Sequence, residues 1–113
     1  MNYLDEEQFS KYAIGPSYAK PVVVMFSTQT CAPCAVMKPL IERLASELSF
    51  PLFGINAVEE KGLVRFYDIR SVPTIAVFKE NKVISTLVGK KTEEQIKDFL
   101  FKAGVTQNTL PGF

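Results

Sequence analysis

The chain has 113 residues, enough for one domain that buries a core without a metal or a disulfide staple. Thirteen basic and twelve acidic residues give a net charge of +1, so composition provides no electrostatic case for nucleic acid or an anionic membrane as a partner. There is no histidine, which excludes Cys–His nucleophilic pairs and the commonest metal ligand.

The first residues are acidic rather than apolar. Asp5, Glu6 and Glu7 stand where a secretory signal would need an uncharged apolar core. The longest apolar run, residues 22–26, is much too short to span a membrane. We therefore expect a cytoplasmic protein. Thiols are kept reduced in that compartment, so two cysteines favour a reactive or metal-binding pair over a structural bridge.

The chain begins with a predicted helix and a predicted strand. A capping box at residues 5–8 opens a helix that is expected to extend to about residue 12. The residues Gly15-Pro16-Ser17 are expected to break it. Residues 22–26 form a continuous β-branched and apolar run, which is typical of a central strand buried on both faces.

A second helix follows the first cysteine, and Pro39 inside it is expected to bend it. Positions three and four residues apart form an inward line, composed of Cys34, Met37, Ile41, Leu44 and Leu48. The opposite, solvent-facing side is expected to hold most of the polar residues, namely Lys38, Glu42, Arg43, Ser46 and Glu47.

The second half alternates strands and helices. Residues 52–56 predict a second buried strand, so strand, helix and strand indicate a right-handed parallel crossover. A short helix is expected at 59–67. Strands at 74–78 and 83–88 are joined by the residues 79–82, which indicate a hairpin. A capping box at Thr92 opens a last helix that ends at Gly104, with its apolar side formed by Ile96, Phe99 and Leu100.

The two cysteines lie at the junction between the first strand and the second helix. Cys31 falls just before the helix, and Pro33 lies in its first turn, where proline is favoured. The free N–H groups at a helix start stabilise a thiolate, which is the nucleophilic form of cysteine. Cys34 lies one turn further on, along the inward line. We therefore expect an exposed attacking Cys31 and a shielded resolving Cys34, as disulfide exchange requires.

Two other roles fit a Cys-x-x-Cys pair. One is half of a zinc site, but without another Cys or His only a dimer sharing four thiolates would complete it. The other is a pair of inert core cysteines, but Cys31 does not lie on the apolar stripe of the helix. In a strand–helix–strand context the redox role is preferred, and no metal is expected.

The sequence resembles the thioredoxin family over residues 1–104. The resemblance rests on the cysteine pair, the bending proline and three later segments, which are Cys31-Ala32-Pro33-Cys34, Pro39, Ile69-Arg70-Ser71-Val72-Pro73-Thr74, Phe78-Lys79-Glu80-Asn81 and Val88-Gly89. It implies an α/β protein with the thioredoxin fold, a central mixed β-sheet flanked by helices on both faces. Residues 105–113 exceed the family core and are expected to form a frayed C-terminal tail, with packing of Leu110 and Phe113 as the alternative.

The resemblance also implies roles for individual residues. Pro73 corresponds to the family's cis-proline, which packs against the cysteines, and Val72 before it offers backbone hydrogen bonds to an extended substrate. Gly89 corresponds to the glycine at the rim of the substrate groove. Thr30 and Ala32, on either side of the first cysteine, belong to the same expected substrate-binding surface. An ordinary trans proline and a simple turn glycine are the alternatives.

Several positions near the site depart from the family's usual residues. Thr30 stands where tryptophan is usual, Ser27 replaces an aromatic residue, and Ala32 replaces glycine. The family's buried acid is Met25 here, and the lysine that commonly partners that acid is Gly54. Losing both avoids an unpaired buried charge. Without the carboxylate, the pKa of Cys31 is expected to fall, and the disulfide is expected to be more oxidising.

The function implied is that of a dithiol reductase acting on protein disulfides. A thioredoxin-reductase-type electron donor would restore the pair, no cofactor beyond the redox-active Cys31–Cys34 disulfide is implied, and a monomer is expected. The role would belong to electron transport and cell redox homeostasis. An oxidant or isomerase is a second possibility. The third is a non-catalytic binding module that uses the groove around Cys31 and Pro73.

Overall fold

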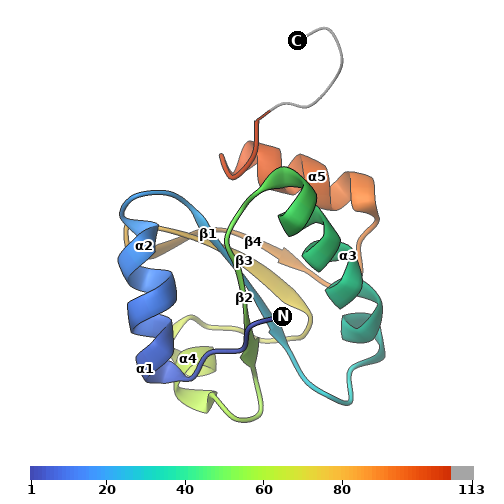
Figure 1. Ribbon diagram of the computed structural model, residues 1–113. Helices are drawn as coiled ribbons and strands as arrows, with labels where there is room; N and C mark the ends of the chain where they lie inside the picture. The colour runs from blue at the N-terminus through green and yellow to red at the C-terminus, as the bar shows by residue number, and fades with distance from the viewer. Residues whose placement is uncertain (108–113) are drawn as a thin grey trace, which may run out of the picture.

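The computed structural model describes residues 1–107 and shows a four-stranded sheet between two layers of helices (Figure 1). The strands are β1 (Val22–Ser27), β2 (Leu52–Asn56), β3 (Thr74–Lys79) and β4 (Lys82–Val88). The helical segments are α1 (Glu6–Phe9), the π-helical turn η1 (Ser10–Ile14), α2 (Gly15–Ser17), α3 (Ala32–Leu48), α4 (Lys61–Phe66) and α5 (Glu93–Lys102).

The sheet is mixed, in the spatial order β2-β1-β3-β4. β1 pairs with β2 in parallel, and with β3 antiparallel, while β3 and β4 form an antiparallel hairpin. The register places Met25 of β1 opposite Gly54 of β2. The parallel crossover through α3 and the central position of β1 confirm the predicted order, and the carboxyl end of β1 leads directly to the cysteines.

Alternation along β1 divides the core into two clusters. Val23 and Met25 face α3 and α5, where they pack with Met37, Ile41 and Ile96. On the other face lie the alternate residues of β1 and the helices α1 and α4, with the core formed by Val22, Val24, Phe26, Phe9, Ala13 and Phe78. Helices therefore cover both faces of the sheet, which confirms the predicted fold class.

The first helix is longer than the sequence predicts. Gly15 and Pro16 do not break it, because the segment passes through a π-helical turn in which the N–H of Gly15 bonds to the carbonyl oxygen of Ser10. Pro16 then lies in the first turn of α2, where a missing N–H costs little. Gly15 itself has helical backbone angles, with φ −54° and ψ −58°. The predicted end near Tyr12 is therefore wrong, because the helical segment continues for about one more turn, to Ser17.

Two other boundaries differ from the prediction. The short helix α4 begins at Lys61 rather than 59, because Asn56 Oδ1 accepts hydrogen bonds from the N–H groups of Val58 and Glu59 and holds them in a turn. The β3–β4 connection is a two-residue turn rather than a four-residue one. Its residues Glu80 and Asn81 both have positive φ, 53° and 64°, as tight hairpins of right-handed twist require.

The N-terminal residues cover the outer edge of β2. Gly54 donates its N–H to the carbonyl oxygen of Asn2, and its own carbonyl accepts from the N–H of Leu4, both at 2.9 Å. Tyr3 thereby forms a parallel bridge with Gly54. At the other end, the N–H of Val105 bonds to the carbonyl oxygen of Leu100, and its side chain packs against the core.

The predicted domain boundary at residue 104 stays a prediction. Leu110 and Phe113, for which packing was the alternative to a frayed tail, lie outside the described residues.

Candidate active site at the start of α3

Cys31 is the N-cap residue of α3, as the sequence predicts. Its Sγ accepts a hydrogen bond of 3.2 Å from the backbone N–H of Cys34, and its carbonyl oxygen accepts one from Ala35. The start of the helix therefore directs the N–H of Cys34 at this sulfur, which favours a thiolate over a thiol at Cys31. Pro33 occupies the first turn of the helix, where its missing N–H leaves no bond unmade.

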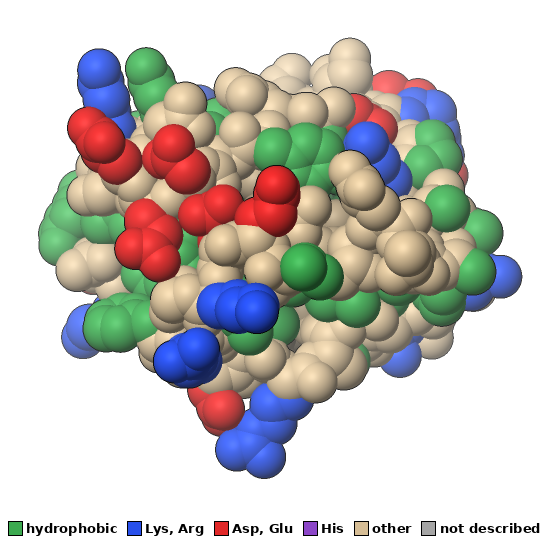
Figure 2. Space-filling model, turned by 90° about the horizontal axis from the view of Figure 1, so that it is seen from below, with side chains coloured by type: hydrophobic (Ala, Val, Ile, Leu, Met, Phe, Trp, Pro, Cys, Tyr) green, Lys and Arg blue, Asp and Glu red, His purple; other side chains and the backbone are tan. Residues whose placement is uncertain are grey.

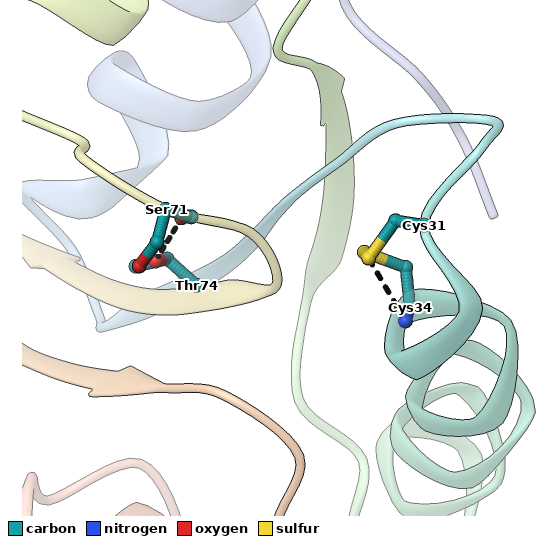
Figure 3. The surroundings of a disulfide bond; sticks show 4 residues. All are labelled: Cys31, Cys34, Ser71 and Thr74. Carbon is teal, nitrogen blue, oxygen red and sulfur yellow. Dashed lines mark hydrogen bonds between the residues drawn. A yellow bond between two sulfur atoms is a disulfide. The ribbon is translucent and has the colours of Figure 1, made fainter.

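The two cysteines form a disulfide with their Cα atoms 5.2 Å apart (Figure 3). They differ strongly in exposure: Cys34 is 3% exposed, whereas Cys31 is half-buried. Cys34 belongs to the core cluster on the α3 side of the sheet, together with Met25 and Met37. One sulfur is therefore accessible to a partner and the other is shielded from it.

The segment before β3 lies opposite the disulfide (Figure 3). The Val72–Pro73 peptide bond is cis, as the family resemblance implies, and Pro73 is buried. Val72 is half-buried and packs against the cluster that contains Cys34. The hydroxyl of Thr74 donates a hydrogen bond of 2.7 Å to the carbonyl oxygen of Ser71, which closes this segment into a turn.

Gly89 completes this side of the site. It follows the last residue of β4, and its N–H donates a hydrogen bond of 2.9 Å to the carbonyl oxygen of Pro73. Its φ of +90° is a conformation that residues with a side chain rarely adopt. Gly89 is thus placed beside the cis-proline, as expected. Thr30 and Ala32 are exposed next to Cys31, so the structure brings the predicted site residues to one end of the sheet.

A pocket of about 440 Å³ extends from the cysteines toward β2. Both sulfur-bearing residues contribute to its wall, together with Tyr3, Ser27, Thr28, Gln29, Ala35, Lys38, Asn56 and Glu59. The sequence alone does not predict that Tyr3, Lys38 or Glu59 lines a pocket next to the cysteines. Lys38 was expected on the solvent side of the helix, but it is half-buried in this wall.

The structure shows how the positions of the family's acid and lysine are occupied. Met25 is completely buried in the same core cluster as Cys34, and Gly54 is its partner across the two strands. A β-carbon at position 54 would lie 2.7 Å from the Tyr3 ring and 2.8 Å from the Met1 sulfur. Side chains from the N-terminal segment therefore fill the space that a lysine at 54 would need.

Comparisons with known proteins agree with this geometry. The family model described as thioredoxin matches residues 1–102. The chain belongs to the thioredoxin family. It is 32% identical to a thioredoxin of Acidithiobacillus ferridurans over 100 residues, which cover 87% of this chain and 91% of that one. It is 34% identical to a thioredoxin of Buchnera aphidicola over 83 residues, 72% of this chain and 76% of the relative.

Solved thioredoxin structures have the same fold. A mutant thioredoxin from Halobacterium salinarum superposes with a TM-score of 0.80 at 23% identity, covering 96% of this chain and 93% of the other. Fasciola hepatica thioredoxin gives 0.81 at 21% identity, covering 91% and 99%. The chain thus has the thioredoxin fold and a disulfide-forming Cys31–Cys34 pair, and it is a thiol–disulfide oxidoreductase of the protein-disulfide reductase type.

Two further observations concern residues 1–107. Within them, no helix is long and apolar enough to cross a membrane. No set of three or more His, Cys, Asp or Glu side chains in the same range is grouped to hold a metal ion.

Proposed function

We propose that the protein reduces disulfides in other proteins, with Cys31 as the attacking thiol and Cys34 as the resolving thiol. The observation that carries the assignment is the difference between the two sulfurs: Cys31 caps α3 and is accessible, whereas Cys34 is 3% exposed. A thiolate at the helix start is both stabilised and within reach of a partner.

The proposed reaction has two exchange steps. The Cys31 thiolate attacks one sulfur of the substrate disulfide, so a Cys31–substrate disulfide forms and the other substrate sulfur leaves as a thiolate. Cys34 then loses its proton and attacks Cys31, and the second substrate sulfur leaves. The two thiolates released take up protons from water. The substrate disulfide is reduced to two thiols, while Cys31 and Cys34 are oxidised to a disulfide.

We propose that the substrate chain docks against Thr30, Ala32, Val72 and Gly89. Two features support this surface. Val72 precedes a buried Pro73 opposite the disulfide, and Gly89 has no atom within 4 Å of where a side chain would begin. Thr30 is exposed and polar, so the surface beside Cys31 suits a polar extended segment better than a strongly apolar one.

The remaining parts of the proposal concern partners and setting. A thioredoxin-reductase-type donor would return two electrons to the Cys31–Cys34 disulfide, and the protein would act as a monomer with no bound cofactor. It would work in the cytoplasm, in electron transport and redox homeostasis. The membership in the thioredoxin family supports protein substrates and a reductase partner in general.

Insulin reduction with dithiothreitol as the electron source tests the assignment. The wild type is expected to turn over and Cys31→Ser to be inactive. In a separate trapping experiment without dithiothreitol, pre-reduced Cys34→Ser is expected to accumulate a mixed disulfide with insulin, which dithiothreitol added afterwards releases. An adduct on Cys31→Ser instead would reverse the two roles. A wild type without turnover, and without an adduct in either variant, would favour the non-catalytic binding module.

The reduction potential tests the direction of the chemistry. Met25 provides no negative charge beside the cysteines, so the Cys31 thiolate is less disfavoured than in a relative with a buried acid. A more stable reduced form means a more oxidising disulfide. Equilibration with glutathione should give a higher potential than that of an acid-bearing thioredoxin, and an equal or lower value would contradict this expectation.

A further inference from the structure

Lys38 and Cys34 share one side of α3. They are four residues apart in the helix, so their side chains emerge about one turn from each other. Both line the pocket that begins at the disulfide, and Lys38 is half-buried in its wall. The pocket has the volume and the polar groups to hold water. A cation is thus placed in the same pocket as the shielded sulfur.

Tyr3 fixes the position of this cation. The Lys38 Nζ lies 5.1 Å from the centroid of the Tyr3 ring, within the range of a cation–π interaction. The ring is held in turn by the backbone bridge between Tyr3 and Gly54. It occupies its place only because position 54 carries no side chain. The Lys38 ammonium therefore has a partner, the Tyr3 ring, on the pocket side of the helix that also carries Cys34.

Cys34 needs such a group in the resolving step. Burial disfavours its thiolate, because a charged sulfur loses hydration in an apolar environment. Met25, in the same core cluster, supplies no carboxylate to take the proton. We propose that the Lys38 ammonium, held over the Tyr3 ring, stabilises the thiolate that Cys34 forms when it resolves the mixed disulfide. In this proposal Tyr3 is a positioning residue that acts through Lys38.

The proton and the electrons are accounted for in this step. The Cys34 proton passes to water in the pocket, and the thiolate's electron pair forms the bond to the Cys31 sulfur. The bond between Cys31 and the substrate breaks, and the substrate sulfur leaves with its electron pair. Lys38 takes no part in the proton transfer and acts by charge alone, so no further oxidant or base is required.

Two carboxylates have to be considered beside Lys38, one by its spacing in α3 and one because it lines the same pocket. Glu42 is one helical turn beyond it in α3, but Glu42 Oε2 pairs with the Met1 amino group at 2.5 Å. Glu59 lines the same pocket from the segment between β2 and α4, and it is exposed. Acidic side chains gather on one side of the face seen from below (Figure 2). Solvent screens an exposed carboxylate strongly, so it does not cancel the half-buried ammonium.

The test measures the pKa of Cys34 directly, in the Cys31→Ser background, from the ultraviolet absorbance of the thiolate. Adding Lys38→Met is expected to raise this pKa by about one unit, which means about tenfold less thiolate at a given pH. Lys38→Arg should keep the pKa near its starting value. Lys79→Met, at the far end of β3, removes the same charge away from the site and is the matched control.

The positioning role of Tyr3 is tested in the same background. Tyr3→Leu should raise the Cys34 pKa in the direction of Lys38→Met, while Tyr3→Phe keeps the ring and should not. In stopped-flow measurements, Lys38→Met should slow substrate release from the mixed disulfide about tenfold. An unchanged Cys34 pKa in folded Lys38→Met, or an equal shift in Lys79→Met, would overturn the inference.

The inference rests on the proposed order of attack, but different experiments test the order of attack and the role of Lys38. A reversal of the cysteine roles would be seen in the trapping experiment with Cys34→Ser. The pKa of Cys34 is measured without turnover, so a null result there rejects the role of Lys38 even if the order of attack is right.

Discussion

The N–H of Gly89 donates a hydrogen bond of 2.9 Å to the carbonyl oxygen of Pro73. This bond connects the end of β4 to the start of β3, so the two segments expected to contact a substrate hold each other in position. Gly89 reaches this geometry with a φ of +90°. A side chain would have open space there, so the constraint at position 89 is backbone strain and not crowding.

Gly89→Ala is therefore expected to lower the free energy of unfolding by about 1–2 kcal/mol in urea titrations. Relief of the strain would shift the Gly89–Pro73 bond and slow insulin reduction. Gly104→Ala is the control, since Gly104 has a φ of +77° at the end of α5, away from the site. It should cost similar stability and leave turnover intact. Equal activity losses in both variants would contradict a role for Gly89 in the substrate surface.

Gly54→Ala should act through the N-terminal segment. The added methyl group would meet the Tyr3 ring at 2.7 Å, so the ring must move away from Lys38. We expect a loss of stability of about 1–3 kcal/mol from overpacking. Gly15→Ala should do the opposite and stabilise by about 0.5–1 kcal/mol, because Gly15 is helical and its nearest neighbour is at 3.7 Å. Thermal and urea unfolding measure the stability of both variants. Equal changes in the free energy of unfolding would contradict the close packing of Tyr3 against Gly54.

Met25→Asp is expected to be destabilising in a pH-dependent way. Position 25 is completely buried, so burial raises the pKa of a carboxyl group there above its unfolded value. A constant part of the cost comes from the lost apolar volume, whereas the part due to ionisation is absent at acid pH, where the group is protonated in both states. It grows as pH rises and is complete above the raised pKa, at about 3 kcal/mol or more. Met25→Leu should cost less than about 1.5 kcal/mol at every pH. A pH-independent loss in Met25→Asp would show that the carboxyl group reaches solvent.

The pair of Arg43 in α3 and Glu93 at the start of α5 should add a small, acid-sensitive stability. The hydrogen bond from Arg43 lowers the pKa of Glu93 below its ordinary value of 4.5. The contribution is therefore present above that value and is lost as pH falls through the lowered pKa. Glu93→Gln should be less stable than wild type at neutral pH and equal to it in acid. Glu94→Gln, one residue along and exposed, removes the same charge and leaves the Arg43–Glu93 pair in place, so it is the matched control.

Local patterns predict the elements that depend on local chemistry. The capping box at Thr92 and the N-cap position of Cys31 are both confirmed, because each depends on residues within one helical turn. The cis bond before Pro73 is confirmed from the family resemblance. The end of the first helix is wrong, since Gly15 and Pro16 signal a break, but a π-helical turn and burial of Ala13 keep the segment helical.

The part of the site that the sequence does not predict depends on contacts between distant residues. Tyr3 reaches the pocket only because the N-terminal segment bridges β2 at Gly54, more than 50 positions later in the chain. Lys38 has the spacing of a solvent-facing residue, but it lines the pocket together with Tyr3, whose ring its Nζ approaches. The spacing of apolar and polar residues along one helix or strand does not predict such contacts between distant segments.

The occupied space at Gly54 has a consequence for how such a site can change over generations. A return to the family's acid and lysine would need three substitutions, and each is harmful alone. An acid at Met25 would be buried without a partner, and a lysine at Gly54 would collide with Tyr3 and Met1. Loss of Tyr3 first would release Lys38. An aspartate at position 25 or a lysine at position 54, introduced singly, should therefore destabilise this protein.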